Sequence, residues 1–354
     1  MARTPWLEQE ELFVSGQGGY HTYRIPALAV SVQGVVLAFC EGRRNGRGDA
    51  GQIELLLRRS ADHGRTWSPP QVVAAEPGMT CGNPCPVVDR DHGTIWLPFC
   101  KNLADGPEQM IVAGRAPRTV WLTCSRDEGR TWAEPVEITA QVKDPAWTWY
   151  ATGPGHGIQL CGGRLLIPCD HIVGRDHGPQ DPYHSHTVFS DDHGATWRIG
   201  GVVPEGTNEC AAVETADGAV YLNCRNYRGA KRRAVAWSRD GGESFAAFDW
   251  DEELVEPICQ ASLARLAHPG PHTPGCVLFA NPASEAREKM TVRMSHDECR
   301  TWSAGRLLYG GPAAYSDLAV LADQTILCLY ERGADSPYGM LTLARCNRAW
   351  LEAG

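Results

Sequence analysis

Three arginines, Arg24, Arg225 and Arg293, are the side chains of this sequence best suited to hold an anion together. An arginine binds a carboxylate through two parallel hydrogen bonds and stays charged at physiological pH. Three arginines that converge on one point repel one another unless an anion lies between them. If the fold gathers these three, a sugar that carries a carboxylate is the natural ligand.

Tyr315 could act on such a sugar as a nucleophile. Where the carboxylate is attached to the anomeric carbon itself, a carboxylate nucleophile would meet like-charge repulsion. A neutral tyrosine hydroxyl avoids this repulsion, provided that a base removes its proton. Taken alone, a tyrosine in an apolar run is more often a core residue, and a loop arginine or aspartate is more often solvated. The hypothesis therefore depends on whether one fold brings these residues together.

An octapeptide repeat, S-x-D-x-G-x-T-W, organises the chain. Its copies begin 65, 65, 48 and 57 residues apart, at Ser60, Ser125, Ser190, Ser238 and Ser295. The aspartate can accept hydrogen bonds within its own turn, and the glycine supplies a positive φ. We therefore expect Asp62, Asp127, Asp192, Asp240 and Asp297 to form hairpin turns rather than to act in catalysis. Two copies depart from the pattern, with Ser244-Phe245 in place of Thr-Trp and Cys299 in place of glycine, and we expect strained or rearranged turns there.

Short apolar runs that read as strands precede each octapeptide, for example at 23–30, 35–43 and 53–60. With the strand that follows the turn, each unit has four antiparallel strands. The last unit has three strands and no octapeptide, and residues 11–16 can supply its fourth strand. The sequence thus predicts an all-β fold, a six-bladed β-propeller of four-stranded antiparallel blades closed by an N-terminal strand. We expect residues 1–354 to form a single domain.

Strand counting places the polar candidates on one face of such a propeller. The octapeptides are turns between third and fourth strands, so they lie on one face. Turns between second and third strands, and the links between units, lie on the other face, where loops are free to carry a site. The residues that map to this second face are Arg24, Arg43, Asp49, Glu209, Arg225, Arg293, Tyr315 and Glu331.

Composition excludes several function classes. The net charge of −9 makes the chain a poor general binder of nucleic acid or anionic membranes. No apolar run is long enough for a membrane-spanning helix. The 14 cysteines are scattered, which predicts buried thiols in a reducing compartment, and the N-terminus lacks a signal-peptide layout. We therefore expect a cytoplasmic protein, unless a leader has been removed.

No cofactor and no metal ion is expected. The pairs His184/His186 and His268/His272 have metal-like spacings, but no third ligand is evident, so loop histidines are the simpler interpretation. The oligomeric state is not predicted by any pattern in the sequence.

Several short motifs together resemble the sialidase family, the exo-α-sialidases or neuraminidases with Asp-box repeats. They are YRIP at 23–26, EGR at 41–43, GPG at 153–155, NEC at 208–210, VRMSHD at 292–297 and YSDL at 315–318. The octapeptide is similar to the family's Asp box, and the resemblance covers residues from about 20 to 345. YRIP alone is weak, whereas five Asp boxes in order make the combination specific.

The resemblance implies catalytic roles for three residues. Tyr315 resembles the nucleophile, and Glu209 resembles the base that activates it. Asp49 resembles the general acid/base, which protonates the leaving oxygen and later activates water.

The resemblance also implies substrate-binding roles. Arg24, Arg225 and Arg293 resemble the triad that grips the substrate carboxylate, and Glu331 resembles the carboxylate that orients Arg24. Arg43 resembles the arginine near the C4 hydroxyl of the sugar.

Residues around the rest of the sugar follow the family less closely. Asn83 and Glu108 could touch its N-acyl or glycerol side. Cys169, Asp170 and His171 stand where some relatives carry aromatic residues, which puts recognition of the glycerol tail in doubt. Trp147, Trp149 and Tyr150 could shape the side that holds the rest of the substrate.

Three functions are therefore open. The first is a retaining hydrolase that removes terminal α-linked sialic acid from a sialylated glycan or sialoside through a tyrosyl-linked intermediate. The second is a sibling enzyme, either a hydrolase of a related nonulosonic acid such as Kdn or a trans-sialidase. The third is an Asp-box propeller that only binds. The joint presence of Asp49, Glu209 and Tyr315 favours an enzyme over a binding module.

Overall fold

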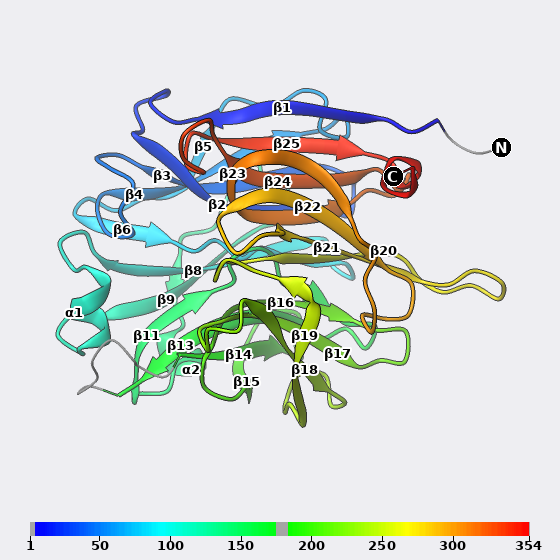
Figure 1. The fold of residues 1–354 in the computed structure, drawn as a ribbon. Helices are drawn as coiled ribbons and strands as arrows, with labels where there is room; N and C mark the ends of the chain where they lie inside the picture. The colour runs from blue at the N-terminus through cyan, green and yellow to red at the C-terminus, as the bar shows by residue number, and fades with distance from the viewer. Residues whose placement is uncertain (1–3, 175–182, 354) are drawn as a thin grey trace.

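The computed structural model describes residues 4–174 and 183–353, and β-strands dominate it (Figure 1). The three helices in these ranges are short: α1 (Glu108–Val112), α2 (Thr139–Val142) and α3 (Arg348–Glu352). The longest has five residues, far fewer than the ~20 that a membrane-spanning helix needs. The all-β prediction is confirmed.

The first sheet joins the two ends of the chain. Its seven antiparallel strands follow the order β1-β25-β24-β23-β22-β21-β20. The N-terminal strand pairs with the last strand, from Leu7 opposite Cys346 to Val14 opposite Met340, as the sequence predicted. Figure 1 shows this pair as a blue strand beside a red one. The bounds are β1 (Leu7–Val14), β20 (Ser262–Ala267), β21 (Cys276–Pro282), β22 (Glu288–Ser295), β23 (Arg306–Val320), β24 (Ile326–Arg332) and β25 (Met340–Cys346).

The second sheet has nine strands in the order β10-β9-β8-β6-β4-β3-β2, with β5 paired to β4 and β7 to β8. The bounds are β2 (Thr22–Val30), β3 (Val36–Arg43), β4 (Ile53–Ser60), β5 (Gln71–Ala74), β6 (Met79–Gly82), β7 (Val87–Asp89), β8 (Thr94–Leu103), β9 (Arg118–Ser125) and β10 (Val136–Glu137).

The remaining two sheets are smaller. One has the order β11-β13-β14-β15 with β12 paired to β13, and the other has the order β16-β17-β18-β19. The bounds are β11 (Trp147–Thr152), β12 (Ile158–Gln159), β13 (Leu165–Val173), β14 (Tyr183–Ser190), β15 (Arg198–Val202), β16 (Thr207–Glu214), β17 (Val220–Asn226), β18 (Arg232–Ser238) and β19 (Ala247–Val255).

The larger sheets arise because hydrogen bonding continues across the predicted unit boundaries. The long strand β23 pairs with β22 through its first half and with β24 through its second half. In the nine-stranded sheet, β4 and β6 share a single parallel contact between Ile53 and Thr80. The predicted groups of consecutive antiparallel strands are therefore present, but two pairs of groups are joined.

The octapeptides form the predicted turns. In the first copy, Asp62 accepts hydrogen bonds from the Thr66 amide at 2.8 Å and from the Thr66 hydroxyl at 2.7 Å. The other four aspartates make the same contacts with the residue four positions later. The expected rearrangement at Ser244 is wrong, because its hydroxyl bonds to Asp240 as a threonine would. Cys299 also keeps the turn, but at a φ of 67°, which is strained for a residue with a Cβ.

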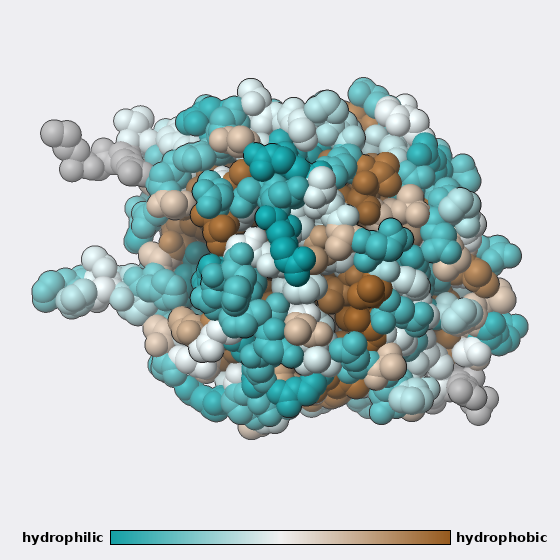
Figure 2. All heavy atoms as spheres, turned by 180° about the vertical axis from the view of Figure 1, so that it is seen from behind, coloured by the Kyte–Doolittle hydropathy of each residue, from teal (hydrophilic) through white to brown (hydrophobic). Residues whose placement is uncertain are grey.

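Apolar side chains fill the space between neighbouring groups of strands. One such cluster joins Phe39 on β3, Leu55 on β4 and Phe99 on β8, all of them fully buried. All 14 cysteines lie in the described residues, where none forms a disulfide and 13 are buried, which confirms the predicted buried thiols. On the surface seen in Figure 2, hydrophobic residues form separate areas among hydrophilic ones.

One ion pair, between Arg233 and Glu256, lies wholly inside the protein. The two side chains are 2.7 Å apart, and Glu256 also accepts a hydrogen bond from the Asn226 amide. Removing one partner would leave a buried charge without compensation. We therefore expect Glu256→Ala to lower the free energy of unfolding by about 3–5 kcal/mol. Chemical denaturation measures this loss.

Glu352→Ala is the matched control for this prediction, because Glu352 pairs with Arg348 on the surface of α3. It should cost less than about 1 kcal/mol. Equal losses in the two variants would contradict the account of the buried pair.

Candidate active site

A cavity of about 220 Å³ opens at one end of the strands and collects most of the predicted site residues. A second cavity of about 290 Å³ is lined largely by apolar strand residues such as Leu28, Leu263 and Leu318. Convergent charged groups distinguish the first cavity as the candidate site. Its predicted lining residues are Arg24, Arg43, Asp49, Asn83, Glu108, Glu209, Arg225 and Tyr315.

Strand direction brings these residues together. Arg24 is the third residue of β2, and Glu209 is the third residue of β16. Arg225 is the last residue but one of β17. In antiparallel neighbours, the start of one strand lies beside the end of the next, so these positions share one end of their sheets. The strand-counting argument therefore predicted their common location.

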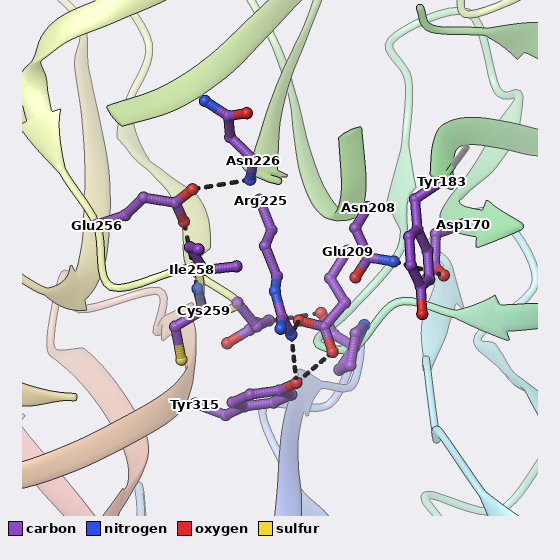
Figure 3. A network of polar contacts seen from close by, with 12 residues as sticks. Asp170, Tyr183, Asn208, Glu209, Arg225, Asn226, Glu256, Ile258, Cys259 and Tyr315 are labelled. Carbon is purple, nitrogen blue, oxygen red and sulfur yellow. Dashed lines mark hydrogen bonds and ion pairs between the residues drawn. The ribbon is translucent and has the colours of Figure 1, made fainter. Parts of the chain in front are cut away.

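Tyr315, Glu209 and Arg225 point toward one another at the base of the cavity (Figure 3). The Tyr315 hydroxyl donates a short hydrogen bond to Glu209 Oε1 and accepts one from Arg225 NH1 at 3.1 Å. The same Arg225 nitrogen lies 2.8 Å from Glu209 Oε2. Burial and the charge of Glu209 raise the pKa of Tyr315 well above its usual value, and Arg225 and Arg24 only partly offset this. The hydroxyl is therefore protonated and already directed at the carboxylate that could accept its proton.

Glu331 holds two parts of the site with one fully buried carboxylate. Its Oε1 accepts hydrogen bonds from Arg24 Nε and from the Ile25 amide, each at 3.0 Å. Its Oε2 accepts from Arg24 NH2 at 3.3 Å and from the Tyr315 amide at 3.1 Å. The predicted contact with Arg24 is present. The contact with the Tyr315 backbone was not predicted.

Asp49 lies between two guanidinium groups at the mouth of the cavity. Its Oδ1 is 2.8 Å from Arg43 NH1 and 3.3 Å from Arg24 NH1. The cavity walls partly desolvate Asp49 and oppose its ionisation although its side chain is 61% exposed, but Arg43 and Arg24 outweigh this effect and lower the pKa of the carboxyl. Arg43 is itself held by Glu41, which lies 2.6 Å from its NH2. A ligand carboxylate at Arg24 would weaken this hold on the Asp49 charge and raise the pKa of Asp49.

The structure does not bring Arg293 to this cavity. Arg293 is the sixth residue of β22, and its NH1 lies 3.4 Å from Asn281 Oδ1. Its assignment to the site face placed Arg293 at the start of its strand, beside a turn between second and third strands, but β22 begins at Glu288. At about 3.3 Å per residue, that error moves the side chain along the strand toward the octapeptide turn at Ser295.

Arg287 takes the position expected of Arg293. It immediately precedes β22 and lines the cavity. Its NH1 donates a hydrogen bond to the Tyr338 hydroxyl at 2.7 Å, and its Cζ lies 5.6 Å from the centre of the Tyr315 ring. Its place between second and third strands could have revealed it, but the VRMSHD motif directed attention to Arg293.

The far end of the cavity combines predicted and unpredicted residues. Asn83 Oδ1 accepts a hydrogen bond from Arg118 at 2.6 Å, and the Arg118 guanidinium lies 4.2 Å from the centre of a Trp149 ring. Glu108, at the start of α1, accepts from the Tyr183 hydroxyl at 2.8 Å. Arg118 and Tyr183 had no signal in the sequence analysis, because neither belongs to a recognised motif.

No histidine within residues 4–174 and 183–353 lines the cavity. His184 and His186 lie on β14 rather than in a loop, and His186 is fully buried beside His171 and Trp147. Burial lowers the pKa of His186 to about 3, so this imidazole is neutral and belongs to the core.

One group of potential metal ligands lies outside the cavity, where the ligating atoms of Asp89, His92 and His193 are within 4.8 Å of one another. Both imidazoles lie within hydrogen-bonding distance of Asp89 Oδ2, at 2.9 and 3.2 Å. These contacts account for the arrangement without an ion.

Comparison with known proteins identifies the family. The BNR repeat-like domain family matches residues 34–328. A sialidase of Micromonospora viridifaciens is 36% identical over 98% of this chain, which spans 55% of that protein's length. An exo-alpha-sialidase of Aspergillus fumigatus is 32% identical, over 95% of this chain and 86% of its own length. Mouse sialidase-3 is 31% identical, over 94% of this chain and 93% of its own length.

Comparison with solved structures also finds sialidases. The Hadza microbial sialidase Hz136 superposes with a TM-score of 0.84 at 29% identity, over 96% of this chain and 68% of its own. A Trypanosoma rangeli sialidase in complex with the inhibitor DANA reaches a TM-score of 0.78 at 19% identity, over 96% of this chain and 59% of its own, and supports the fold alone. The chain belongs to the sialidase family.

Proposed function

We propose that this protein is an exo-α-sialidase, a retaining glycoside hydrolase that removes terminal α-linked sialic acid from glycoconjugates or oligosaccharides. The observation that carries this proposal is the contact of the Tyr315 hydroxyl with both Glu209 and Arg225 in an arginine-lined cavity. A neutral nucleophile already paired with a base suits an anomeric carbon that bears a carboxylate. The curated relatives named as sialidases support the same activity.

The arginines would bind the sugar first. Arg24, Arg225 and Arg287 surround the Tyr315 ring or hydroxyl, so a carboxylate held by them would place the anomeric carbon near the tyrosine oxygen. Glu331 holds both Arg24 and the Tyr315 backbone in position for this step. In this proposal Arg287 replaces Arg293 as the third arginine.

The reaction would then proceed in two halves. Glu209 takes the Tyr315 proton while the tyrosine oxygen bonds to the anomeric carbon, and Asp49 donates a proton to the departing oxygen. In the second half, Asp49 takes a proton from water as that water attacks the anomeric carbon. The bond to Tyr315 breaks, and Glu209 returns the proton to the phenolate. Two displacements at one carbon give net retention.

The strand order and pairing support a proposal about the fold. We propose that the strand groups form a six-bladed propeller within a single domain, because the groups are consecutive and antiparallel and the first strand pairs with the last. Two links join neighbouring groups into the larger sheets. One is the single Ile53–Thr80 contact, and the other is strand β23, which pairs with β22 and then with β24. The cytoplasmic location stays a prediction.

A panel of sialosides with and without a sugar acceptor tests the function. We expect release of free sialic acid from aryl and oligosaccharide sialosides, with no product in which the sugar is transferred to the acceptor. Transfer products would identify a trans-sialidase. Faster cleavage of the C5-hydroxyl sugar Kdn would identify a Kdn hydrolase, and binding without cleavage would identify a binding module.

Arg287 and Arg293 offer a paired test of the third arginine. Arg287→Met is expected to lower kcat/KM by at least ~30-fold, because loss of one partner from a buried charge pair costs about 2 kcal/mol or more. Arg293→Met keeps a side chain of similar length and should leave kcat/KM close to that of the parent. If Arg293→Met lowers kcat/KM more than Arg287→Met does, Arg293 is the third arginine of the substrate-binding triad, as the sequence predicted.

A further inference from the structure

Asp89, His92 and His193 form a cluster of possible metal ligands beside the third octapeptide turn, outside the cavity that holds Tyr315. Asp89 ends β7, and His92 follows it in the turn into β8. His193 lies between β14 and β15. The carboxylate and one imidazole therefore come from the nine-stranded sheet, and the second imidazole comes from a different sheet.

The distances within this cluster suit a tetrahedral ion. Nδ1 of His92 and Nδ1 of His193 lie 2.9 and 3.2 Å from the same oxygen, Asp89 Oδ2. Neighbouring ligand atoms of a tetrahedral Zn²⁺, with bonds of about 2.0–2.2 Å, are about 3.3–3.5 Å apart. An ion could therefore be held between the three atoms after only small movements of the side chains.

Asp89 is oriented as a ligand before any ion binds. Its other oxygen, Oδ1, accepts hydrogen bonds from the Asp91 amide at 3.1 Å and from Gln159 Nε2 at 3.2 Å. The side chain of Asp89 is 1% exposed, so these contacts fix its orientation and leave Oδ2 facing the imidazoles. Hydrogen bonds of this kind orient the carboxylate ligands of metal sites.

The two imidazoles are open to solvent, in contrast to the carboxylate. The side chains of His92 and His193 are 57% and 44% exposed, and both line an open hollow of about 500 Å³ together with Asp89. Because they lie at the surface, the imidazoles can turn aside to admit an ion and then close on it. Asp91 Oδ2, which is 3.9 Å from His193 Nδ1, is near enough to add a second negative charge beside a divalent cation.

The first octapeptide offers an internal comparison. His63 occupies the position that His193 has in the third copy, with φ of 65° and 58° respectively. Its Nδ1 also faces one carboxylate, that of Asp323, at 3.4 Å. A contact between neighbouring turns therefore needs only one imidazole and one carboxylate. At the third copy, His92 brings a second imidazole to the same oxygen, which such a contact does not require.

We propose that Asp89, His92 and His193 bind a zinc ion that links the two sheets. A mixed set of imidazole and carboxylate ligands suits Zn²⁺, whereas Mg²⁺ and Ca²⁺ prefer oxygen ligands alone. Each imidazole binds the ion through Nδ1 in the neutral form that carries its proton on Nε2. An ion that joins distant parts of the chain only in the folded state stabilises that state.

Calorimetric titration of the metal-stripped protein with Zn²⁺ tests the site. The parent protein should bind one ion, and its thermal transition should move to higher temperature as Zn²⁺ saturates it. His92→Ala and His193→Asn should each weaken the affinity by at least ~100-fold, because even the hydrogen bonds that support a metal ligand contribute about 10–100-fold. Asparagine is chosen at position 193 because it tolerates a positive φ. Mg²⁺ at the same concentration should have no effect.

His63→Asn is the matched control, since it makes the same change at the same position of another octapeptide. It should leave both the affinity for Zn²⁺ and the shift of the thermal transition unchanged. The thermal transition without Zn²⁺ shows whether each variant folds. If His92→Ala does not fold, His92→Gln, which keeps a polar side chain in the turn, takes its place.

Three results would overturn the proposal. They are an unchanged affinity in His92→Ala or His193→Asn, an equal loss in His63→Asn, and Zn²⁺ binding by the parent that leaves its thermal transition unmoved. The last result would mean an adventitious surface ion only. None of these measurements needs turnover, so they stand apart from the proposed hydrolase activity.

Discussion

Tyr315→Phe is expected to lower kcat by at least ~10²-fold while leaving the protein folded. The substitution removes only the hydroxyl, which is the atom that Glu209 and Arg225 hold in the cavity. Without it, no covalent intermediate can form, and Glu209 would have to act directly on an anomeric carbon that bears a like charge. Steady-state and single-turnover kinetics on an aryl sialoside measure the loss.

Tyr309→Phe is the matched control for this prediction. Tyr309 lies on the same strand, and its hydroxyl bonds to the Gly333 carbonyl at 2.9 Å outside the cavity. It should keep near-parental kcat. Near-normal turnover in Tyr315→Phe would contradict the proposed nucleophile, whatever the control does.

Asp49→Ala is expected to separate substrates by their leaving groups. A general acid contributes about 10²–10⁴-fold where the departing oxygen needs a proton. Sialyl-lactose has such a leaving group, so its kcat/KM should fall by that factor. An aryl sialoside with an acidic phenol needs little protonation and should lose far less in the step that forms the intermediate.

The pH dependence gives this prediction a second readout. Arg43 and Arg24 lower the pKa of Asp49 in the free protein, so removing the charge of Arg43 should raise that pKa. The Asp49-dependent limb of the kcat/KM profile for sialyl-lactose should therefore move to higher pH in Arg43→Met. Equal losses on both classes of substrate in Asp49→Ala, or an unmoved limb in Arg43→Met, would contradict the role of Asp49.

The sequence predicted the strands and turns well because their signals are local. An aspartate four residues before a threonine can close its turn with no help from distant residues, and all five copies do so. Even Ser244 preserves the contact, because the turn needs only a hydroxyl at that position. The pairing of β1 with β25 was also predictable, since a unit with three strands leaves an open edge.

The direction of the strands was enough to predict where the site lies. Predicting which residues line it required the exact ends of the strands. Arg225 was placed correctly because it lies within one residue of the end of its strand, whereas Arg293 was misplaced by five residues and Arg287 was passed over. The boundary of β22 is set by pairing with β21 and β23, which no local pattern reports.

Contacts between residues that are far apart in the chain could not be predicted from the sequence. Asp170 was noted only as a departure from relatives. Its side chain accepts hydrogen bonds from Trp149 and Asn208, which approach it from two other strands. Likewise, the link from Glu331 to the Tyr315 backbone is visible only when β23 and β24 are seen side by side.

Proton NMR of the first sugar released from an α-sialoside tests the central claim most directly. A double displacement through Tyr315 predicts that the α-anomer of free sialic acid appears first and then converts to the β-anomer in solution. Initial appearance of the β-anomer would exclude the tyrosyl intermediate, and no release at all would exclude the hydrolase.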